Sequence, residues 1–274
     1  MKYVIPAVLC MFLALACKKN TQENTTPPNA SSSAVLDSSF FYSTGPKEIV
    51  LVSSKFQYDP QGRFTGIYAV MTDSTEDHHP GAPPDTSTLV LTYSGADTLP
   101  STYYYQEQQN YYPQGAPGTA MLAYDNQGRV ILDSPVNPIY TLHFTYGDGY
   151  ATRTDQDLVA TIDTLFTDGN NISIYKVGPN YFLHSFTYSN YPNPYYMPQL
   201  AAHLGPVLYN EILDISSKNL FSKQVYSDIY GETARIYNYT WTLNSDGQVI
   251  AGVGTDQNTG QPVEYYRFVY KNQN

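Results

Sequence analysis

The sequence predicts an all-β protein: an antiparallel meander of β-hairpins that forms a curved or barrel-like sheet, with a short helical insert near residues 198–213. Two observations predict it. A tripeptide of one apolar residue, one variable residue and one aromatic residue recurs along the chain, and a glycine-containing turn motif occurs twice, with a fainter third copy. The composition agrees, because 28 tyrosines and only 14% charged residues suit half-buried pleated surfaces.

The recurring tripeptide has the pattern of a half-buried strand. Residues i and i+2 of a strand face the same side, so each copy places two large side chains on one face of the sheet. The residue between them is usually Thr, Gln or Ala. We therefore expect each copy to lie in one strand of a hairpin. The copies are Phe56-Gln57-Tyr58, Leu91-Thr92-Tyr93, Leu122-Ala123-Tyr124, Phe144-Thr145-Tyr146, Phe186-Thr187-Tyr188 and Phe268-Val269-Tyr270, with Tyr239-Thr240-Trp241 as a variant.

The turn motif has the pattern Tyr-Asp-x-x-Gly-Arg-apolar. It spans Tyr58–Phe64 and Tyr124–Val130, and a weaker copy spans Leu243–Val249. This pattern favours a type I turn followed by a glycine with positive φ. A side chain at that glycine would cost about 1–2 kcal/mol. The residues predicted to build these turns are Asp59, Gly62, Asp125, Gly128, Asp246 and Gly247.

One stretch interrupts the strand pattern. Residues 198–205 and 206–213 each begin with proline and carry apolar residues three and four positions apart. Proline is well tolerated in a first helical turn, and Gly205 can end the first segment. This pattern predicts two short helices.

The first residues predict the compartment. Lys2 precedes an apolar run of fourteen residues, which is shorter than the roughly 20 needed to span a membrane and fits a cleaved secretory signal. The residues before Cys17 resemble a bacterial lipobox, in which the cysteine carries diacylglycerol after cleavage, although Ala14 stands where leucine is usual. The alternatives are an ordinary cleaved signal and an uncleaved anchor. The predicted organisation is a lipoprotein signal at 1–17, a flexible polar tether at 18–45 and one β-rich domain at 46–274.

Composition excludes several classes of function. Cys10 would leave with the signal and Cys17 would be lipidated, so the mature domain has no disulfide and no thiol chemistry. The net charge of −10, which becomes −11 when Lys2 is removed, argues against a nucleic-acid partner. Nucleophile elbows, phosphate-binding glycine loops and paired-histidine zinc helices are absent from the sequence, so neither a cofactor nor an enzymatic activity is expected.

Two groups of residues are candidate sites. Asp77, His78 and His79 form the densest group of possible metal ligands, but adjacent histidines on an extended chain point apart, so a solvated hairpin loop is the preferred interpretation. The segment 101–118 is predicted to be an exposed aromatic loop whose rings contact a sugar or a protein partner. The alternative is that these tyrosines simply cover a curved sheet. The candidate contacts are Tyr103, Tyr104, Tyr105, Tyr111 and Tyr112.

The order of the motifs resembles a group of uncharacterised lipoproteins of Bacteroidota. The resemblance covers residues 46–271 and rests on the repeated turn motif, Asp168–Ile172, Tyr188–Pro194, Ser217–Leu220 and Tyr265–Lys271. Single hairpins also resemble the YD repeats of large secreted shell-forming proteins. The resemblance implies an all-β lipoprotein of the outer membrane or periplasm and carries over no catalytic residue. Lys18-Lys19-Asn20 stands where an acidic export signal is common in this phylum, so the periplasmic face and the cell surface both stay open.

The leading functional hypothesis is a non-enzymatic cell-envelope lipoprotein, held to the membrane by its N-terminal lipid, that binds a glycan or a protein partner. One alternative is an envelope structural or assembly component whose sheet packs against another protein. The other is a hydrolase that uses a pair of carboxylates.

Overall fold

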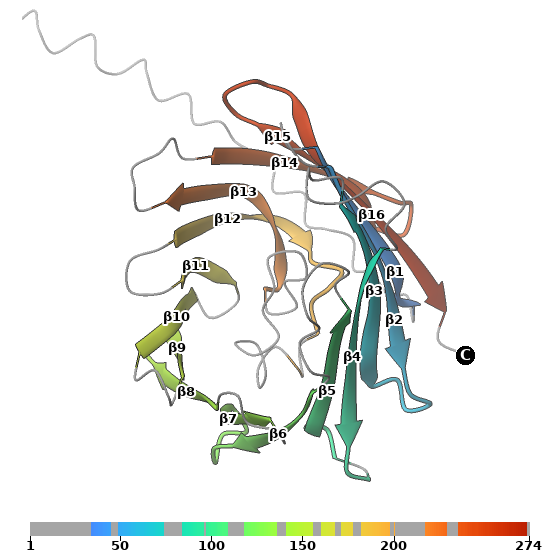
Figure 1. The fold of residues 1–274 in the computed structure, drawn as a ribbon. Helices are drawn as coiled ribbons and strands as arrows, with labels where there is room; N and C mark the ends of the chain where they lie inside the picture. Colours follow the sequence, from blue (N-terminus) through green and yellow to red (C-terminus); the bar gives the residue numbers. More distant parts are fainter. Residues whose placement is uncertain are drawn as a thin grey trace, which may run out of the picture.

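In the computed structural model the chain forms a closed barrel of sixteen antiparallel strands (Figure 1). Each strand pairs with the next along the chain, and β1 closes the barrel by pairing with both β2 and β16. The predicted all-β, barrel-like sheet is therefore confirmed. The structure describes residues 34–44, 49–73, 84–95, 97–108, 118–135, 141–155, 160–167, 171–177, 182–197, 200, 217–228 and 235–272.

The strands differ in length, from six to eleven residues. They are β1 (Ala34–Thr44), β2 (Ile49–Tyr58), β3 (Phe64–Asp73), β4 (Asp85–Tyr93), β5 (Pro100–Gln108), β6 (Gly118–Tyr124), β7 (Val130–Pro135), β8 (Leu142–Gly147), β9 (Tyr150–Asp155), β10 (Ala160–Thr167), β11 (Ile172–Val177), β12 (Phe182–Pro192), β13 (Asn219–Asp228), β14 (Arg235–Leu243), β15 (Val249–Asp256) and β16 (Pro262–Asn272).

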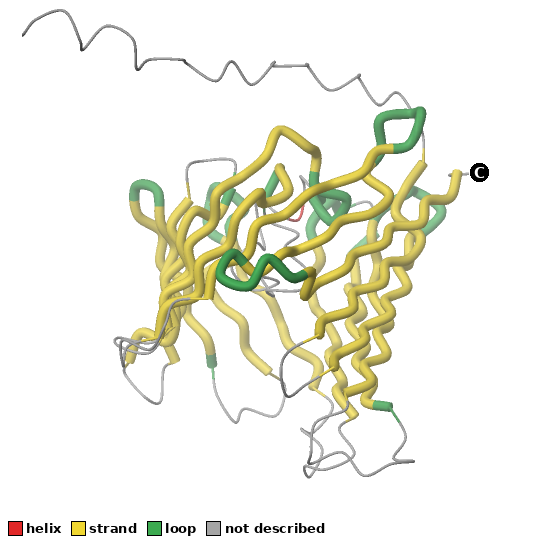
Figure 2. Tube along the Cα trace, turned by 90° about the horizontal axis from the view of Figure 1, so that it is seen from above, coloured by secondary structure: helices red, strands yellow, loops and turns green. Residues whose placement is uncertain are grey.

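One end of the barrel, called here the turn end, carries the tight turns from β2 to β3, β6 to β7, β8 to β9 and β14 to β15. The first residue of β1, Ala34, pairs with the last residue of β16, Asn272, so the barrel also begins and ends there. Figure 2 shows several described turns at the end where the C-terminus lies. At the opposite end, connections such as that from β3 to β4 fall largely outside the described residues.

Strand β1 corrects one predicted boundary. The tether was predicted to extend to residue 45, but Ala34–Thr44 is a full barrel strand. Its inward residues Leu36 and Phe41 are buried in the core. A β-bulge between Leu36 and Ser38 breaks the alternation of the strand, so the pattern of period two that marks a strand is hidden in the sequence.

Aromatic and aliphatic side chains fill the inside of the barrel. A sixteen-stranded barrel is too wide for its wall side chains to meet across it. Part of the space is filled by the connection from β12 to β13, where the Tyr195 ring packs on Phe56 and Phe268 with centroid separations of 6.0 and 5.3 Å. Leu200 from the same connection is buried as well. The rest of the predicted helical insert at 198–213 lies outside the described residues. Within the described ranges, no helix is long and apolar enough to cross a membrane.

The recurring tripeptide places a hydrogen-bond donor at the turn end of a strand. In every copy the last residue points into the barrel and donates to a backbone carbonyl of the preceding strand. Tyr58 Oη donates to the Leu36 carbonyl at 3.0 Å and Tyr93 Oη to the Phe64 carbonyl at 2.8 Å. The others are Tyr124 to Pro100, Tyr146 to Val130, Tyr188 to Ile172, Tyr270 to Val249 and, through its indole Nε1, Trp241 to Phe221. We call these seven donors the tyrosine ring.

Each accepting carbonyl sits beside a β-bulge. The register shifts between Leu36 and Ser38 in β1, and again next to Phe64 in β3 and Val130 in β7. A bulge disrupts the ladder of backbone bonds, which leaves a carbonyl in need of a donor. One member of the tyrosine ring supplies that donor in each case, through a tyrosine hydroxyl or, for Trp241, through its indole N–H. The repeat in the sequence is therefore a repeat of bulge and tyrosine together.

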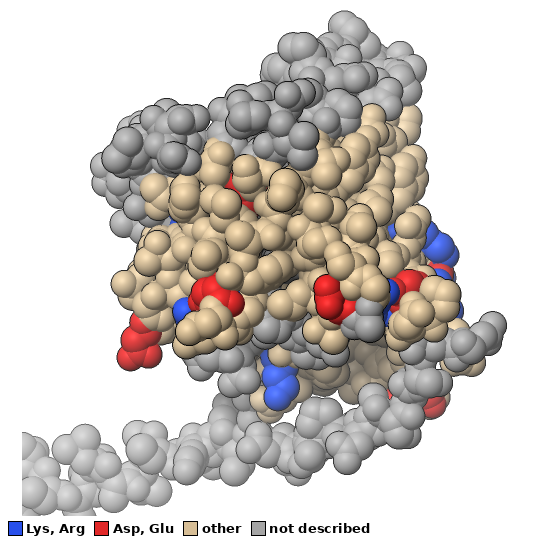
Figure 3. Space-filling model, turned by 90° about the horizontal axis from the view of Figure 1, so that it is seen from below, with Lys and Arg blue, Asp and Glu red and all other residues tan. Residues whose placement is uncertain are grey.

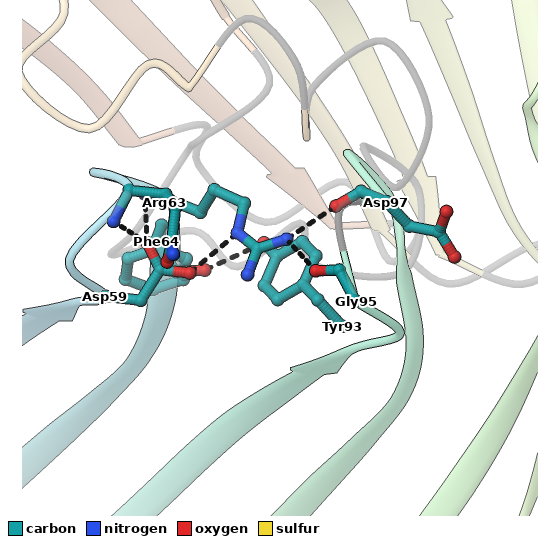
Figure 4. Close-up of polar contacts among 7 residues, drawn as sticks. Asp59, Arg63, Phe64, Tyr93, Gly95 and Asp97 are labelled. Atoms are coloured by element: carbon teal, nitrogen blue, oxygen red, sulfur yellow. Dashed lines mark hydrogen bonds and ion pairs between the residues drawn. The ribbon is translucent and has the colours of Figure 1, made fainter.

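The turn motif joins neighbouring hairpins, as Figure 4 shows for its first copy. Asp59 Oδ1 accepts hydrogen bonds from the backbone N–H groups of Gln61 and Arg63 at 2.9 and 2.8 Å, and Gly62 has a φ of 78°. Arg63 Nε binds Asp59 Oδ2 at 2.6 Å, while its guanidinium lies 4.6 Å from the centre of the Tyr93 ring. The same guanidinium donates to the carbonyls of Gly95 and Asp97 in the next turn, at 3.0 and 2.7 Å.

The second copy repeats this arrangement and the third modifies it. Asp125 accepts from two backbone N–H groups, and Arg129 lies 4.4 Å from the Tyr146 ring. In the third copy Asn244 takes the capping position and accepts from the backbone of Asp246 and Gln248 at 3.0 and 2.9 Å. Asp246, predicted as the turn carboxylate, thus contributes its backbone N–H to the cap. Gly247 has a φ of 79°.

Replacing Gly62 with valine should lower the free energy of unfolding by about 1–2 kcal/mol, because a branched side chain is strained at positive φ. Gly62→Asn is the matched control, since asparagine tolerates this conformation. Thermal unfolding of the two variants, followed by circular dichroism, measures the difference. Equal midpoints for Gly62→Val and the wild type would contradict the turn assignment.

Replacing Tyr93 with phenylalanine should lower the free energy of unfolding by about 1–3 kcal/mol, because the carbonyl of Phe64 loses its hydrogen-bond donor. Tyr68→Phe removes a hydroxyl from an outward, exposed ring and should leave the midpoint of chemical denaturation unchanged. If both variants lose the same stability, the bond to the bulge carbonyl has no special weight.

Candidate functional site

Two groups of polar side chains in the lining of the barrel each contain a buried carboxyl whose pKa is raised by burial, and both lie farther from the turn end than the tyrosine ring. The first, the Glu264 group, lies on the inward faces of β13, β14 and β16. The second, the Asp133 group, lies on the inward faces of β5, β7 and β9. They are the candidate functional sites among the described residues.

The Glu264 group is a closed hydrogen-bond network. Glu264 Oε2 accepts from the hydroxyls of Tyr239 and Tyr266 at 2.7 and 3.0 Å. The Tyr239 hydroxyl also contacts Oε1 of the buried Gln224, which accepts from Tyr226 at 3.0 Å. Gly254 on β15 makes room for this network, because a Cβ there would lie 2.7 Å from the Tyr239 ring.

Burial controls the charge of the Glu264 group. It raises the pKa of Glu264, and the hydrogen bonds from Tyr239 and Tyr266 oppose this only in part. It also raises the pKa of both tyrosines well above their ordinary value. Burial lowers the pKa of His184, whose ring packs edge-on against Tyr226 at 4.6 Å. The network therefore favours neutral forms, and its donors serve acceptors of the protein itself.

The Asp133 group has an acceptor that the protein leaves unused. Asp133 is 2% exposed, and its Oδ2 accepts a hydrogen bond from Tyr103 Oη at 2.5 Å. Its Oδ1 is buried without a hydrogen-bond partner. Burial raises the pKa of Asp133, while the Tyr103 hydroxyl and the charge of Arg153 on β9 oppose the rise. Asp133 Oδ1 is therefore a buried acceptor that no protein donor satisfies.

Three of the predicted contact tyrosines lie in strand β5, so the prediction of an exposed loop from residue 101 is wrong for residues 101–108. Tyr103 and Tyr105 face the inside of the barrel, because they pair with the inward Leu91 and Leu89. Tyr104 faces outward and donates to Gln106 Oε1 at 2.7 Å. The sequence did not reveal this strand, because three consecutive tyrosines show no alternation of polar and apolar residues.

Several predicted site residues lie outside the described residues: Cys17, Asp77, His78, His79, Tyr111 and Tyr112. In the part of the chain that the structure describes, no group of three or more His, Cys, Asp or Glu side chains could hold a metal ion. Sequence reasoning selected neither Asp133 nor Glu264. A polar residue on an otherwise apolar inward face was their signal, but the bulge after Val130 shifts the alternation that would reveal Asp133.

The outer wall is mostly uncharged and mixes polar with apolar side chains. Figure 3 shows one side of it, with charged side chains gathered along one edge. Outward threonines include Thr72, Thr88, Thr92, Thr102, Thr119, Thr145, Thr152, Thr187, Thr240 and Thr242. Exposed apolar residues such as Leu51, Met121 and Leu183 stand among them. Basic residues also face outward on this wall: Lys55, which pairs with Asp37 at 2.5 Å, Lys223 in the middle of β13, and Arg267 in the middle of β16.

Replacing Glu264 with glutamine tests the buried carboxyl. Because the pKa of Glu264 is raised in the fold, the stabilisation from its protonated form is present below the ordinary value of 4.5 and is lost as pH rises through the raised pKa. The melting temperature of Glu264→Gln relative to wild type should therefore increase as pH rises from 4.5, and then level off. Thermal scans from pH 4 to 8 measure it.

Asp256→Asn is the control for this experiment. Backbone hydrogen bonds from Thr259 and Asn258 lower the pKa of Asp256, so its stabilisation is lost only as pH falls below 3.8. The difference between Asp256→Asn and wild type should stay flat between pH 4.5 and 8. A flat profile for Glu264→Gln as well would show that its carboxyl titrates normally.

Comparison with known proteins identifies a similar fold. No protein-family model matches the chain, and no curated protein matches it significantly. A porin-like protein from Bacteroides uniformis, known from its crystal structure, superposes with a TM-score of 0.55 at 13% sequence identity, over 86% of this chain and 98% of that one. A porin-like protein from Bacteroides vulgatus aligns over 84% of this chain and 86% of its own at 11% identity, but its TM-score of 0.27 supports no common fold. The barrel of this chain is similar to a porin-like barrel.

Proposed function

We propose that the protein is a lipid-tethered barrel of the cell envelope, whose wall stands in water and which acts by binding a glycan or a protein partner. The lipobox-like sequence at Cys17 supports the anchor. The porin-like description of the Bacteroides uniformis neighbour supports the envelope as the compartment. The observation that carries the proposal is the distribution of apolar side chains across the barrel wall.

A transmembrane barrel has an apolar band outside and a polar interior. This barrel differs from that pattern, because its interior holds a buried apolar core and its outer wall mixes exposed apolar residues with threonines and basic side chains. Phe56, Trp241 and Phe268 are buried inside it. Threonines cover much of the outside, and Lys223 and Arg267 face outward in the middle of their strands. A basic side chain at the bilayer midplane would cost about 2–4 kcal/mol at each such position. The wall therefore suits water on its outer side.

The position of the lipid gives the barrel an orientation. Cys17 precedes Ala34, the first residue of β1, by 17 positions, and β1 begins at the turn end. As a random coil, a segment of that length has a reach of about 20–25 Å. The turn end then lies toward the bilayer, and the opposite end of the barrel points away from it.

Binding is preferred to catalysis because of how the buried carboxyls are held. The Glu264 carboxyl is occupied by tyrosine hydroxyls of the protein itself, so it is not presented to a substrate. The Asp133 carboxyl has an unused acceptor oxygen, which suits recognition of a hydroxyl. These contacts favour a binding role over the hydrolase alternative.

Replacing Cys17 with alanine tests the tether and the water-facing wall together. We expect the wild type to incorporate labelled fatty acid and to remain with membranes. A variant whose residues 1–17 are exchanged for a signal cut by the ordinary signal peptidase should lose the label and appear as a folded barrel in the soluble envelope fraction. Cys17→Ala itself should lose the label.

Alkaline carbonate extraction separates the alternatives. A protein that lacks the lipid and still resists extraction would be integral to the bilayer, which would overturn the water-facing wall. A wild type without fatty acid would overturn the tether alone.

A further inference from the structure

We propose that the inside of the barrel on the β5–β9 side binds a neutral saccharide, with Tyr105 packing on the sugar ring and Asp133 and Arg153 bonding its hydroxyls. This inference rests on the proposed function and specifies its ligand and its site. It starts from two observations that nothing in the tyrosine ring or the turns requires: an exposed ring on an inward face, and a buried carboxylate oxygen without a partner.

The first observation concerns access to the inside of the barrel. Tyr105 faces inward, yet it is 43% exposed. The other large, exposed apolar side chains whose direction follows from the strand register point outward. Its register partner Leu89 and the nearby Ser87 on β4 are also partly exposed. Solvent therefore reaches the inner wall at the level of Tyr105.

The second observation lies closer to the turn end. Tyr103 lies two residues before Tyr105 on the same face of β5, and its hydroxyl donates a hydrogen bond to Asp133 Oδ2. Asp133 is almost fully buried, and its Oδ1 has no hydrogen-bond partner. Buried acceptors without a partner are rare in folded proteins, because water is lost and nothing replaces it. A ligand hydroxyl donated to Oδ1 would satisfy this oxygen.

The charges select the chemical class of the ligand. An anion is disfavoured by Asp133 and by the net charge of −10. A cation is disfavoured by Arg153, whose charge acts on Asp133. A neutral molecule with adjacent hydroxyls satisfies both groups, since one hydroxyl donates to the carboxylate and another accepts from the guanidinium. The C–H face of a sugar ring also packs on an aromatic ring such as Tyr105.

The register of β5 supplies a matched pair of variants. Tyr105→Ala removes the inward ring, and Tyr104→Ala removes the outward ring one residue away. The intact lipoprotein, purified in an amine-oxide detergent that contains no sugar, is titrated by calorimetry with maltose, cellobiose, lactose, mannobiose and xylobiose. We expect at least one of them to bind. The Kd of the disaccharide that binds should rise at least about fivefold in Tyr105→Ala and in Asp133→Asn, as expected when one aromatic contact or one charged acceptor is lost. It should not change in Tyr104→Ala.

Two outcomes would overturn the inference. One is a folded protein that binds no disaccharide of the panel, as expected if only a water molecule occupies the space at Asp133 Oδ1. The other is a loss of binding in Tyr104→Ala as large as in Tyr105→Ala. Carbonate extraction of membranes that contain the variant with the exchanged signal keeps the two proposals apart. If this unlipidated barrel is extractable and the wild type binds no sugar, only the site is contradicted. If it resists extraction and the wild type binds a sugar, only the water-facing wall is contradicted.

Discussion

The bond from an inward tyrosine hydroxyl to the carbonyl beside a β-bulge is the contact on which the barrel depends. A wide sheet must curve to close, and bulges bend and twist a strand at a fixed position. Each bulge takes a carbonyl out of the ladder, and leaving it unpaired inside the barrel would cost about 1–3 kcal/mol. Tyr58, Tyr93 and their counterparts remove that cost, so curvature and aromatic packing come from the same residues.

The turn motif links these bonds around the barrel. Within one copy, the Tyr58 hydroxyl bonds back to β1, the strand before its own. Arg63 contacts the ring of Tyr93 and the turn that follows β4. Asp59 holds the arginine in place and caps its own turn. The motif therefore combines four residues with different roles. The tyrosine bonds to the preceding strand, the aspartate caps the turn, the glycine adopts a positive φ and the arginine contacts the following hairpin. The third copy replaces the ion pair with an amide pair, Asn244 to Gln248 at 3.0 Å, which keeps the cap without a charge.

Local signals predicted the hairpins, and non-local contacts decided what could not be predicted. The turn glycines and the tripeptide depend on residues a few positions apart, so the sequence shows them directly. Closure depends on β1 pairing with β16, between Ala34 and Asn272, and a bulge hides the alternation of β1. The same reason hides Asp133, because its inward direction follows a bulge in β7. Tyr105 gives a further case: its residue type suggested a contact, but only the register shows that it faces inward.

The uneven filling of the barrel bears on where the proposed ligand would enter. Sixteen strands enclose more space than their own side chains fill, and the filling is uneven along the axis. Toward the turn end, the inserted Tyr195 packs against Phe56 and Phe268, and the buried Asn193 and Ser217 lie on the same connection. Farther from it, the lining becomes polar at Glu264 and Asp133, and Tyr105 is open to solvent. In the proposed binding mode, a sugar would enter from the side of the exposed Tyr105. A lipid attached at Cys17, as proposed, would lie nearer the turn end, so anchoring and ligand access would use opposite ends of one barrel.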